Sequence, residues 1–130
     1  MEIRKCQKED LKTIKEISLL SLKAVLSMKY FERNLGNTIV AVERGRIIGF
    51  LIFRKDYVMN FAVHPEFRKK GVGKKLIGEI MKKLKTIRLR TRESNKDTID
   101  FLNELNFKEK RMIEQYYLNG DNAIEMEWKK

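Results

Sequence analysis

The sequence predicts a mixed α/β fold in which helices pack on a central sheet. Two observations lead to this prediction. Short apolar runs bounded by turn residues alternate with longer stretches in which apolar residues recur at a helical period. The resulting order is a strand, one or two helices, three strands, a helix, a strand, a helix and two strands, which is typical of helices packed on a sheet. Because no Pro/Gly/Ser-rich linker interrupts the 130 residues, we expect a single domain over 1–130.

The first half of the chain is expected to hold four strands and two helices. We expect strands at apolar or alternating runs between turn residues: 2–6, 38–42, 46–53 and 57–63. We expect helices at two stretches: 10–26 and 27–35. Ser27 is the candidate N-cap of the second helix, and Gly36-Asn37 is a stop signal at its end.

The second half is expected to add two helices and three strands. The helices are predicted over 72–84 and 95–105, and the strands over 86–92, 107–117 and 123–128. In the strand over 86–92, apolar residues alternate with Arg88, Arg90 and Arg92, so these three arginines share one face. That face is either a solvated sheet surface or a site that favours acidic groups, since arginine pairs well with carboxylates.

The charge and composition of the chain restrict its class and its partners. The single cysteine, Cys6, has no internal disulfide partner, which suits a reducing compartment. The longest apolar run, 47–53, is far shorter than the roughly 20 residues that span a bilayer. The first ten residues hold no apolar targeting stretch, so we expect a cytoplasmic protein without a membrane partner. The net charge of +11 attracts polyanions, and nucleic acid is one class of them. However, no stacking motif or metal-ligand spacing supports a nucleic-acid-binding module.

The segment AVHPEFRKKGVGKK, residues 62–75, is the strongest candidate binding site. An apolar strand ends at Val63, a glycine-containing loop follows, and a helix begins near Val72. Helix N-termini present unpaired N–H groups and partial positive charge, and glycines there let an anion reach the backbone. Basic side chains surround the same helix start: Arg68, Lys69, Lys70, Lys74 and Lys75. The segment predicts a site for a pyrophosphate-bearing ligand, although turn glycines beside a solvated lysine face give the same pattern.

Four stretches resemble a known family. NFAVHPEFRKKGVGKKLI resembles the acetyl-CoA signature of the GCN5-related N-acetyltransferases (GNAT), and NKDTIDFLNELNF occupies the place of that family's downstream asparagine segment. LSMKYFERNL and YYLNGDNAIEM resemble segments of the ribosomal-protein N-terminal alanine acetyltransferases. The resemblance covers nearly the whole chain and implies a mostly antiparallel central sheet with helices on both faces.

The resemblance also implies a cosubstrate, a reaction and a set of site residues. The strand backbone at Phe61, Ala62 and Val63 would bind the pantetheine and the thioester carbonyl of acetyl-CoA, with the Val63 N–H as oxyanion donor. Asn95 would contact the pantetheine arm. The helix start would hold the pyrophosphate through seven residues: Arg68, Lys69, Lys70, Gly71, Val72, Gly73 and Lys74. The implied reaction is direct attack of a primary amine on the thioester, and the expected acceptor is a protein or peptide N-terminus.

Two positions depart from the family pattern. Leu102 stands where the family has a tyrosine general acid, and Arg90 stands where the alanine acetyltransferases have a glutamate base. Leucine cannot donate a proton, and arginine is not a base at ordinary pH. The substitutes by sequence position are Tyr57, Tyr116, Tyr117 and Glu93. Alternatively, water protonates the leaving thiolate, since a thiol of pKa ~8.5 is a moderate leaving group.

Several residues and functions stay open at this point. Tyr116 and Tyr117 are expected on opposite faces of a strand, with one in the core and the other at the acceptor groove. His64 is interpreted as a surface turn residue, Cys6 as a buried structural thiol, and Asn106 as a left-handed residue that ends a helix. The alternative functions are acetyl transfer to a small amine or a lysine side chain, and a CoA-binding regulatory protein with weak catalysis.

Overall fold

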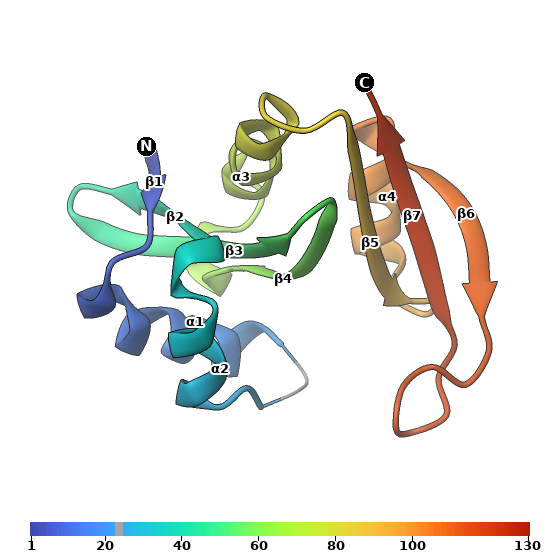
Figure 1. Cartoon of the computed structure of the whole chain (residues 1–130), viewed down its shortest axis with the longest axis horizontal. Helices are drawn as coiled ribbons and strands as arrows, with labels where there is room; N and C mark the ends of the chain where they lie inside the picture. Colours follow the sequence, from blue (N-terminus) through green and yellow to red (C-terminus); the bar gives the residue numbers. More distant parts are fainter. Residues whose placement is uncertain (23–24) are drawn as a thin grey trace.

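The chain folds around one sheet, which Figure 1 shows for a computed structural model that describes residues 1–22 and 25–130. The seven strands of this sheet lie in the order β1-β2-β3-β4-β5-β7-β6. β4 and β5 are parallel, and the other neighbours pair antiparallel. The bounds are β1 (Glu2–Lys5), β2 (Thr38–Glu43), β3 (Arg46–Arg54), β4 (Tyr57–Val63), β5 (Thr86–Arg92), β6 (Lys108–Ile113) and β7 (Ala123–Lys129). This topology confirms the predicted mixed, mostly antiparallel sheet.

Helices cover both faces of the sheet, as the resemblance implies. α1 (Leu11–Ser21) and α2 (Met28–Arg33) pack on one face, where Phe31 is completely buried against Phe50 of β3. α3 (Val72–Met81) packs on the other face of β2–β4, and α4 (Lys96–Glu104) lies against β5 and β7 (Figure 1). Short 3₁₀ turns occupy Lys8–Asp10, Leu35–Asn37 and Pro65–Phe67. No helix among the described residues is long and apolar enough to cross a membrane.

The ends of the helices follow from local chemistry. Ser27 caps α2 as predicted, because its Oγ accepts a hydrogen bond of 3.2 Å from the Tyr30 N–H. α1 ends at Ser21, earlier than predicted, because Leu22 has an extended backbone with φ −106° and ψ 146°. Residues 23–24 of that predicted helix lie outside the described residues. Asn106 has φ +71°, the left-handed conformation expected after α4.

The predicted strand over 107–117 is wrong at its C-terminal end, because β6 stops at Ile113. Gln115 has φ +50°, and its N–H donates to the Asn122 Oδ1 at 2.9 Å. This bond across the connection to β7 holds the chain in a loop. Tyr116 and Tyr117 therefore lie in the β6–β7 loop rather than on opposite faces of a strand.

β4 and β5 separate soon after they meet. The described pairing between them consists of Tyr57 with Arg88 and Val58 with Leu89. Beyond these residues β4 continues beside β3, and β5 continues beside β7. Residues 59–63 thus have a strand partner on their β3 side alone, and the backbone groups on the other edge can bind a ligand.

Candidate functional site

The backbone N–H of Val63 points into the opening between β4 and β5. The next N–H along the chain, that of His64, donates to the Ile48 carbonyl of β3 at 2.8 Å. Since alternate residues of a strand direct their N–H groups to opposite sides, the Val63 N–H is directed away from β3. Ser21, the last residue of α1, donates to the Val63 carbonyl at 2.9 Å and holds this end of β4 against the helix. This placement fits the role of oxyanion donor that the resemblance assigns to Val63.

The start of α3 offers backbone N–H groups to an anion. Gly71 is the N-cap, with φ +82°, a conformation that favours glycine, and it brings no side chain to cap the helix. The first N–H groups of this ten-residue helix have no intrahelical acceptors. The Val72 side chain is buried in the core, so this residue offers its backbone alone. The basic residues of the segment are exposed around the helix start: Arg68, Lys69, Lys70, Lys74 and Lys75.

An aromatic pair beside this helix start was not predicted. A Cβ on Gly73 would lie 3.2 Å from the Cζ of Phe101, so the absence of a side chain lets the α4 ring approach α3. The Phe101 ring centroid lies 6.3 Å from that of Phe61 on β4. These two rings form an apolar wall between β4, α3 and α4. The neighbouring Leu102 is completely buried, which makes the family's tyrosine position a core position in this chain.

Asn95 has a structural role that was not predicted. It is the N-cap of α4, and its Oδ1 accepts a hydrogen bond of 3.2 Å from the Thr98 N–H. The residue is exposed at the edge of the α4 start. The cap uses one lone pair of the oxygen, so the amide nitrogen and the second lone pair are not used by it.

A cavity of about 670 Å³ opens beside α2 and the start of β4. It is lined by Tyr30, Tyr57, Tyr116 and Tyr117, together with Arg90, residues 54–56 of the β3–β4 turn and residues 58–59. We call it the tyrosine cavity. Its walls come from four separate parts of the chain, which meet where β4 and β5 begin to diverge. Tyr30 also donates a hydrogen bond to the Asn60 side chain of β4, which ties α2 to the diverging strand.

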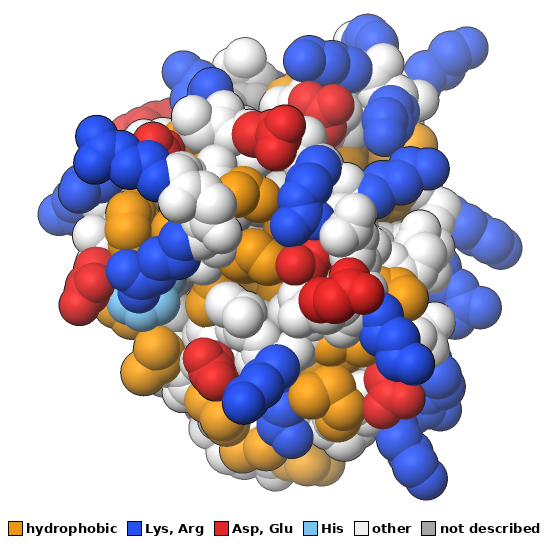
Figure 2. All heavy atoms as spheres, turned by 90° about the vertical axis from the view of Figure 1, so that its left-hand side faces the viewer, with side chains coloured by type: hydrophobic (Ala, Val, Ile, Leu, Met, Phe, Trp, Pro, Cys, Tyr) orange, Lys and Arg blue, Asp and Glu red, His pale blue; other side chains and the backbone are white. Residues whose placement is uncertain are grey.

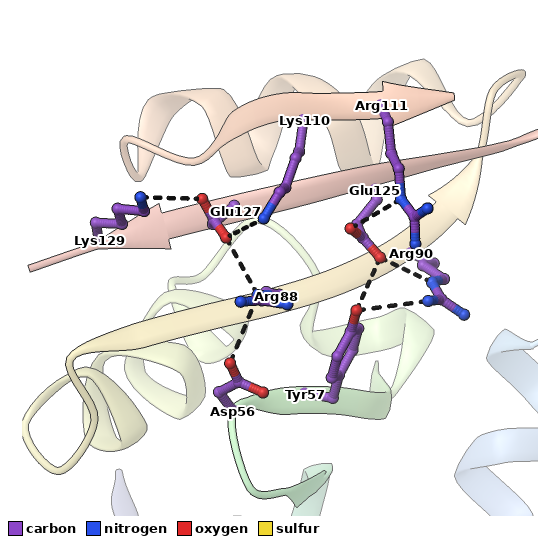
Figure 3. Close-up of polar contacts among 9 residues, drawn as sticks. All are labelled: Asp56, Tyr57, Arg88, Arg90, Lys110, Arg111, Glu125, Glu127 and Lys129. Atoms are coloured by element: carbon purple, nitrogen blue, oxygen red, sulfur yellow. Dashed lines mark hydrogen bonds and ion pairs between the residues drawn. The ribbon is translucent and has the colours of Figure 1, made fainter. Parts of the chain in front are cut away.

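A buried carboxylate stands behind the tyrosine cavity. Glu125 of β7 is 1% exposed and is the cross-strand partner of Arg90. Figure 3 shows three donors converging on it from β4, β5 and β6. Arg90 Nε donates at 3.0 Å, the Tyr57 hydroxyl at 2.9 Å and Arg111 Nε at 3.2 Å. Burial alone would raise the pKa of Glu125, but these hydrogen bonds outweigh it and hold the pKa at about 2. Glu125 is therefore a permanent anion near neutral pH.

Arg90 is held in place by two tyrosines as well as by Glu125. Its Nη1 donates to the Tyr116 hydroxyl at 3.3 Å and its Nη2 to the Tyr57 hydroxyl at 3.4 Å. Its guanidinium carbon lies 5.3 Å from the centroid of each of these rings. The hydrogen bonds to Tyr116, Glu125 and Tyr57 raise the pKa of Arg90 further above its ordinary value. Arg90 thus stays protonated.

The predicted face of three arginines is present, and each arginine has acidic partners. Arg88 lies 3.1 Å from Glu127 and 3.5 Å from Asp56, and Arg92 lies 2.9 Å from Asp121. Figure 3 shows Arg88 and Arg90 side by side along β5, on the same face as the two glutamates of β7. This sheet face is a network of ion pairs.

The expectation that one of Tyr116 and Tyr117 lies in the core is wrong. Both line the tyrosine cavity, because the loop, unlike a strand, does not send consecutive side chains to opposite faces. Burial raises the pKa of Tyr117, so its hydroxyl keeps its proton near neutral pH. Glu93 is exposed just beyond β5 and is not a lining residue of this cavity.

His64 and Cys6 have the structural surroundings that were predicted. His64 Nδ1 accepts a hydrogen bond of 3.1 Å from the Glu66 N–H and so caps the Pro65–Phe67 turn. Cys6 is buried, and burial raises the pKa of its thiol to about 11. Within residues 1–22 and 25–130, no group of three or more His, Cys, Asp or Glu side chains is placed to hold a metal ion.

The central parallel strands of the sheet diverge beside an uncapped helix start, and this arrangement places the chain in a known fold family. The chain belongs to the acetyltransferase (GNAT) family, whose model matches residues 3–107. It is similar to the N-alpha-acetyltransferases of Saccharolobus solfataricus, with 35% identity over 81 residues, and Sulfurisphaera tokodaii, with 31% identity over 81 residues. Each match covers 58% of this chain and 48% of the relative, so the chain spans about half the length of these relatives.

Solved structures confirm the GNAT fold over almost the whole chain. The ribosomal-protein-S18-alanine N-acetyltransferase from Escherichia coli has a TM-score of 0.86 and 25% identity, with 98% of this chain and 92% of that chain covered. Ard1 from Thermoplasma volcanium has a TM-score of 0.89 and 23% identity, with 98% and 96% covered. The ribosomal-protein N-terminal alanine acetyltransferases, which the sequence resembles, thus include a structural neighbour of this chain.

Proposed function

We propose that the chain is an acetyl-CoA-dependent N-acetyltransferase whose acceptor is the N-terminal amine of a protein or peptide. The main support for this proposal is that the diverging edge of β4 lies between two candidate binding sites. The α3 start and its basic residues lie at one end of residues 59–63, and the tyrosine cavity lies at the other. The N-alpha-acetyltransferases to which the chain is similar support the choice of acceptor.

The acetyl-CoA site is assigned to residues that the fold brings together. The N–H groups at Gly71, Val72 and Gly73 suit the pyrophosphate, because they are uncapped and surrounded by cations. The edge of β4 at 61–63 suits the pantetheine, whose amides match the donors and acceptors of an unpaired strand. The Phe61–Phe101 wall supplies apolar contact beside that edge.

The reaction forms an amide and releases a thiol. The neutral amine attacks the thioester carbon, the Val63 N–H stabilises the oxyanion, and the carbon–sulfur bond breaks to release CoA thiolate. The amine loses one proton and the thiolate gains one. Neither transfer passes through Leu102 or Arg90, since the first is apolar and buried and the second is a paired cation.

The proton path is proposed to run through the tyrosine cavity. Water in the cavity can take the amine proton, and the hydroxyls of Tyr116 and Tyr117 can donate to it or accept from it. The Tyr57 hydroxyl donates its proton to Glu125 and can accept from this water. Tyr57 and Tyr116 are anchored by Arg90, so their hydroxyls have fixed positions at the cavity wall. Glu93, the remaining candidate, lies outside the cavity lining.

Two alternatives within the GNAT class remain to be tested. A small amine or a lysine side chain would use the same acetyl-CoA site with a different acceptor. A CoA-binding regulatory protein with weak catalysis is the second alternative. It is favoured because Leu102 lies in the core and Arg90 is in an ion pair, so neither can serve as the family's usual proton donor or base.

The nucleic-acid alternative has less support. Figure 2 shows Lys and Arg side chains around one face of the molecule, with acidic and apolar side chains between them. A continuous basic surface with stacked aromatic rings is the usual arrangement for nucleic acid, and this face lacks that continuity among its described residues.

The proposed compartment is the cytoplasm, where Cys6 stays a reduced thiol.

The cosubstrate is tested by thermal stabilisation with acetyl-CoA. The wild type is expected to melt at higher temperature as acetyl-CoA is added, because a ligand that binds the folded state alone stabilises it. Gly71→Asp places a carboxylate and a strained φ of +82° at the pyrophosphate position, and it should abolish the shift. Gly120→Asp is the matched control, since Gly120 has φ +90° in the β6–β7 loop. Absence of a shift in the wild type would sink the cosubstrate assignment.

The acceptor is tested by release of CoA from acetyl-CoA. Peptides with free N-termini, the same peptides with blocked N-termini and an internal lysine, and small amines form the panel. Turnover on free N-termini is the expected result. Turnover on small amines or lysine alone would replace the acceptor class, and binding without any turnover would favour the regulatory alternative.

A further inference from the structure

The tyrosine cavity has a net positive charge. Among its lining residues Arg54, Lys55 and Arg90 are cations and Asp56 is the one acidic group, which gives 3 − 1 = +2. Asp56 also lies 3.5 Å from Arg88, so its charge is shared with a cation that does not line the cavity. A free N-terminal ammonium is itself cationic. The acceptor that enters this cavity is therefore disfavoured unless it brings negative charge with it.

Arg90 has hydrogen-bonding capacity left over. A guanidinium carries five N–H groups, and the described contacts use three of them, one on each nitrogen. One N–H on Nη1 and one on Nη2 remain, and a guanidinium can bind a carboxylate through two such N–H groups. The side chain is 30% exposed, so this edge is accessible from the cavity.

The surroundings of Arg90 fix its geometry without cancelling its charge. The Tyr57 and Tyr116 rings lie on it at 5.3 Å each, which orders the side chain before any ligand arrives. Glu125 is shared between Arg90 and Arg111, so this group of three charges sums to 2 − 1 = +1. Arg88 and Arg92, by comparison, do not line the cavity.

Arg90 stands at the entrance to the diverging edge of β4, at the tyrosine-cavity end of residues 59–63. It follows Leu89, the last residue of β5 that pairs with β4, and so stands where the two strands begin to separate. The acceptor amine must reach the β4 edge from the tyrosine cavity, and it passes Arg90 on the way. The residues that follow this amine in a peptide then lie in the cavity, where the guanidinium is exposed.

We infer that the acceptor is a polypeptide N-terminus with Asp or Glu at its first or second residue, whose side-chain carboxylate binds Arg90 between Tyr57 and Tyr116. This inference rests on the proposed function and specifies the substrate of the same site. A charge-assisted bidentate contact predicts that an acidic peptide has a kcat/KM ~10- to 100-fold above that of its amide counterpart. The preference should weaken with added salt, because the cavity is open to solvent.

The test compares peptides that differ in one charge. CoA release is measured at saturating acetyl-CoA with Asp/Asn, Glu/Gln and Ser-Asp/Ser-Asn N-termini on one otherwise neutral peptide. The wild type should prefer each acidic member of a pair, and Arg90→Gln should bring the acid-to-amide ratio close to one. Arg111→Gln is the matched control, because it removes the other arginine of Glu125 from outside the cavity. The Arg111 variant should keep the wild-type ratio.

The outcomes separate this inference from the proposed function. Equal turnover of acidic and amide peptides by the wild type overturns the acidic acceptor and leaves N-terminal acetylation intact. No turnover of any peptide overturns the proposed function itself. If the Arg90 and Arg111 variants lose the preference equally, the preference comes from the overall positive charge of this face, and the Arg90 site is overturned. If Arg90→Gln does not fold, Arg90→Lys replaces it. Lysine keeps the positive charge but lacks the planar N–H groups that bind a carboxylate in the bidentate mode, so the acid-to-amide ratio should still fall several-fold.

Discussion

Replacement of Glu125 by glutamine tests the network that shapes the tyrosine cavity. The substitution keeps the side-chain size and removes the single negative charge that Arg90, Arg111 and Tyr57 share. We expect a less stable protein at pH 7, because two arginines lose their anion while the buried site keeps its shape. Glu127→Gln is the matched control. Glu127 lies on the same face of β7 and pairs with Arg88 and Lys110, away from Tyr57.

The size of the effect follows from the pKa of Glu125 and from the exposure of its partners. The interval between the ordinary value of 4.5 and about 2 corresponds to at most ~3 kcal/mol. Arg90 is 30% and Arg111 is 57% exposed, so water screens the pairs and rehydrates both cations after the substitution. We therefore expect a loss of ~2 kcal/mol, or a fall in Tm of about 7 °C for a chain of this length.

The pH dependence gives the sharpest result. Glu125 has a folded-state pKa below its unfolded one, so its contribution is complete above pH 4.5 and is lost as the pH falls towards about 2. The difference in unfolding free energy between wild type and Glu125→Gln, measured with urea, should shrink by roughly half between pH 7 and pH 3. A difference that stays constant over this range, or one below about 0.5 kcal/mol at pH 7, would show that Glu125 does not stabilise the fold as an anion.

Three further predictions concern other parts of the molecule. Gly49→Val should destabilise the fold and weaken acetyl-CoA binding, seen by melting and by calorimetry, because a Cβ there meets the Ala62 carbonyl and a Val72 methyl at 3.1 Å each and pushes α3 off the sheet. Tyr57→Phe should lower kcat more than it raises KM for acetyl-CoA, since its hydroxyl lies in the cavity rather than at the α3 start. Cys6 should resist iodoacetamide at pH 8 in the folded protein and react after unfolding, followed by mass spectrometry, because the pKa of its buried thiol is about 11.

The parts of the site that depend on local sequence could be predicted. The α3 start follows from a strand end, a left-handed glycine and an amphipathic helix, which all lie within residues 62–81. The alternation of arginines along β5 was likewise visible in one short run. Ser27 and Asn106 took their predicted roles because capping and left-handed turns depend on the residue and its immediate neighbours.

The parts that depend on contacts between distant residues could not be predicted. The divergence of β4 from β5 depends on which neighbouring strand each of them continues to pair with. Residue 73 must be glycine because the ring of Phe101, 28 positions further along the chain, occupies the space of a side chain. The role of Glu125 had a signal that was missed. Glu125 and Glu127 alternate along the last strand with the same period of two as the arginines along β5, which is the pattern of opposite charges on paired strands.

The described carboxylates at the tyrosine cavity, Asp56 and Glu125, are each paired with arginine, and this favours an N-terminal amine over a lysine side chain as the acceptor. An α-amine has a pKa of ~7.7–8.0, so roughly a tenth of it is neutral at pH 7, whereas a lysine of pKa ~10.4 is neutral in less than a thousandth of its molecules. A glutamate at position 90 would help to remove the proton, but Arg90 cannot, and Glu125 is already bound by three donors. Without that help the supply of neutral amine limits the rate. The difference in neutral fraction alone then makes the rate on an N-terminal amine ~10²–10³-fold higher than the rate on a lysine side chain at pH 7. The rate on peptide N-termini should therefore rise with pH up to the pKa of the amine, and a rate that is flat between pH 6 and pH 8 would reveal a base that these residues do not supply.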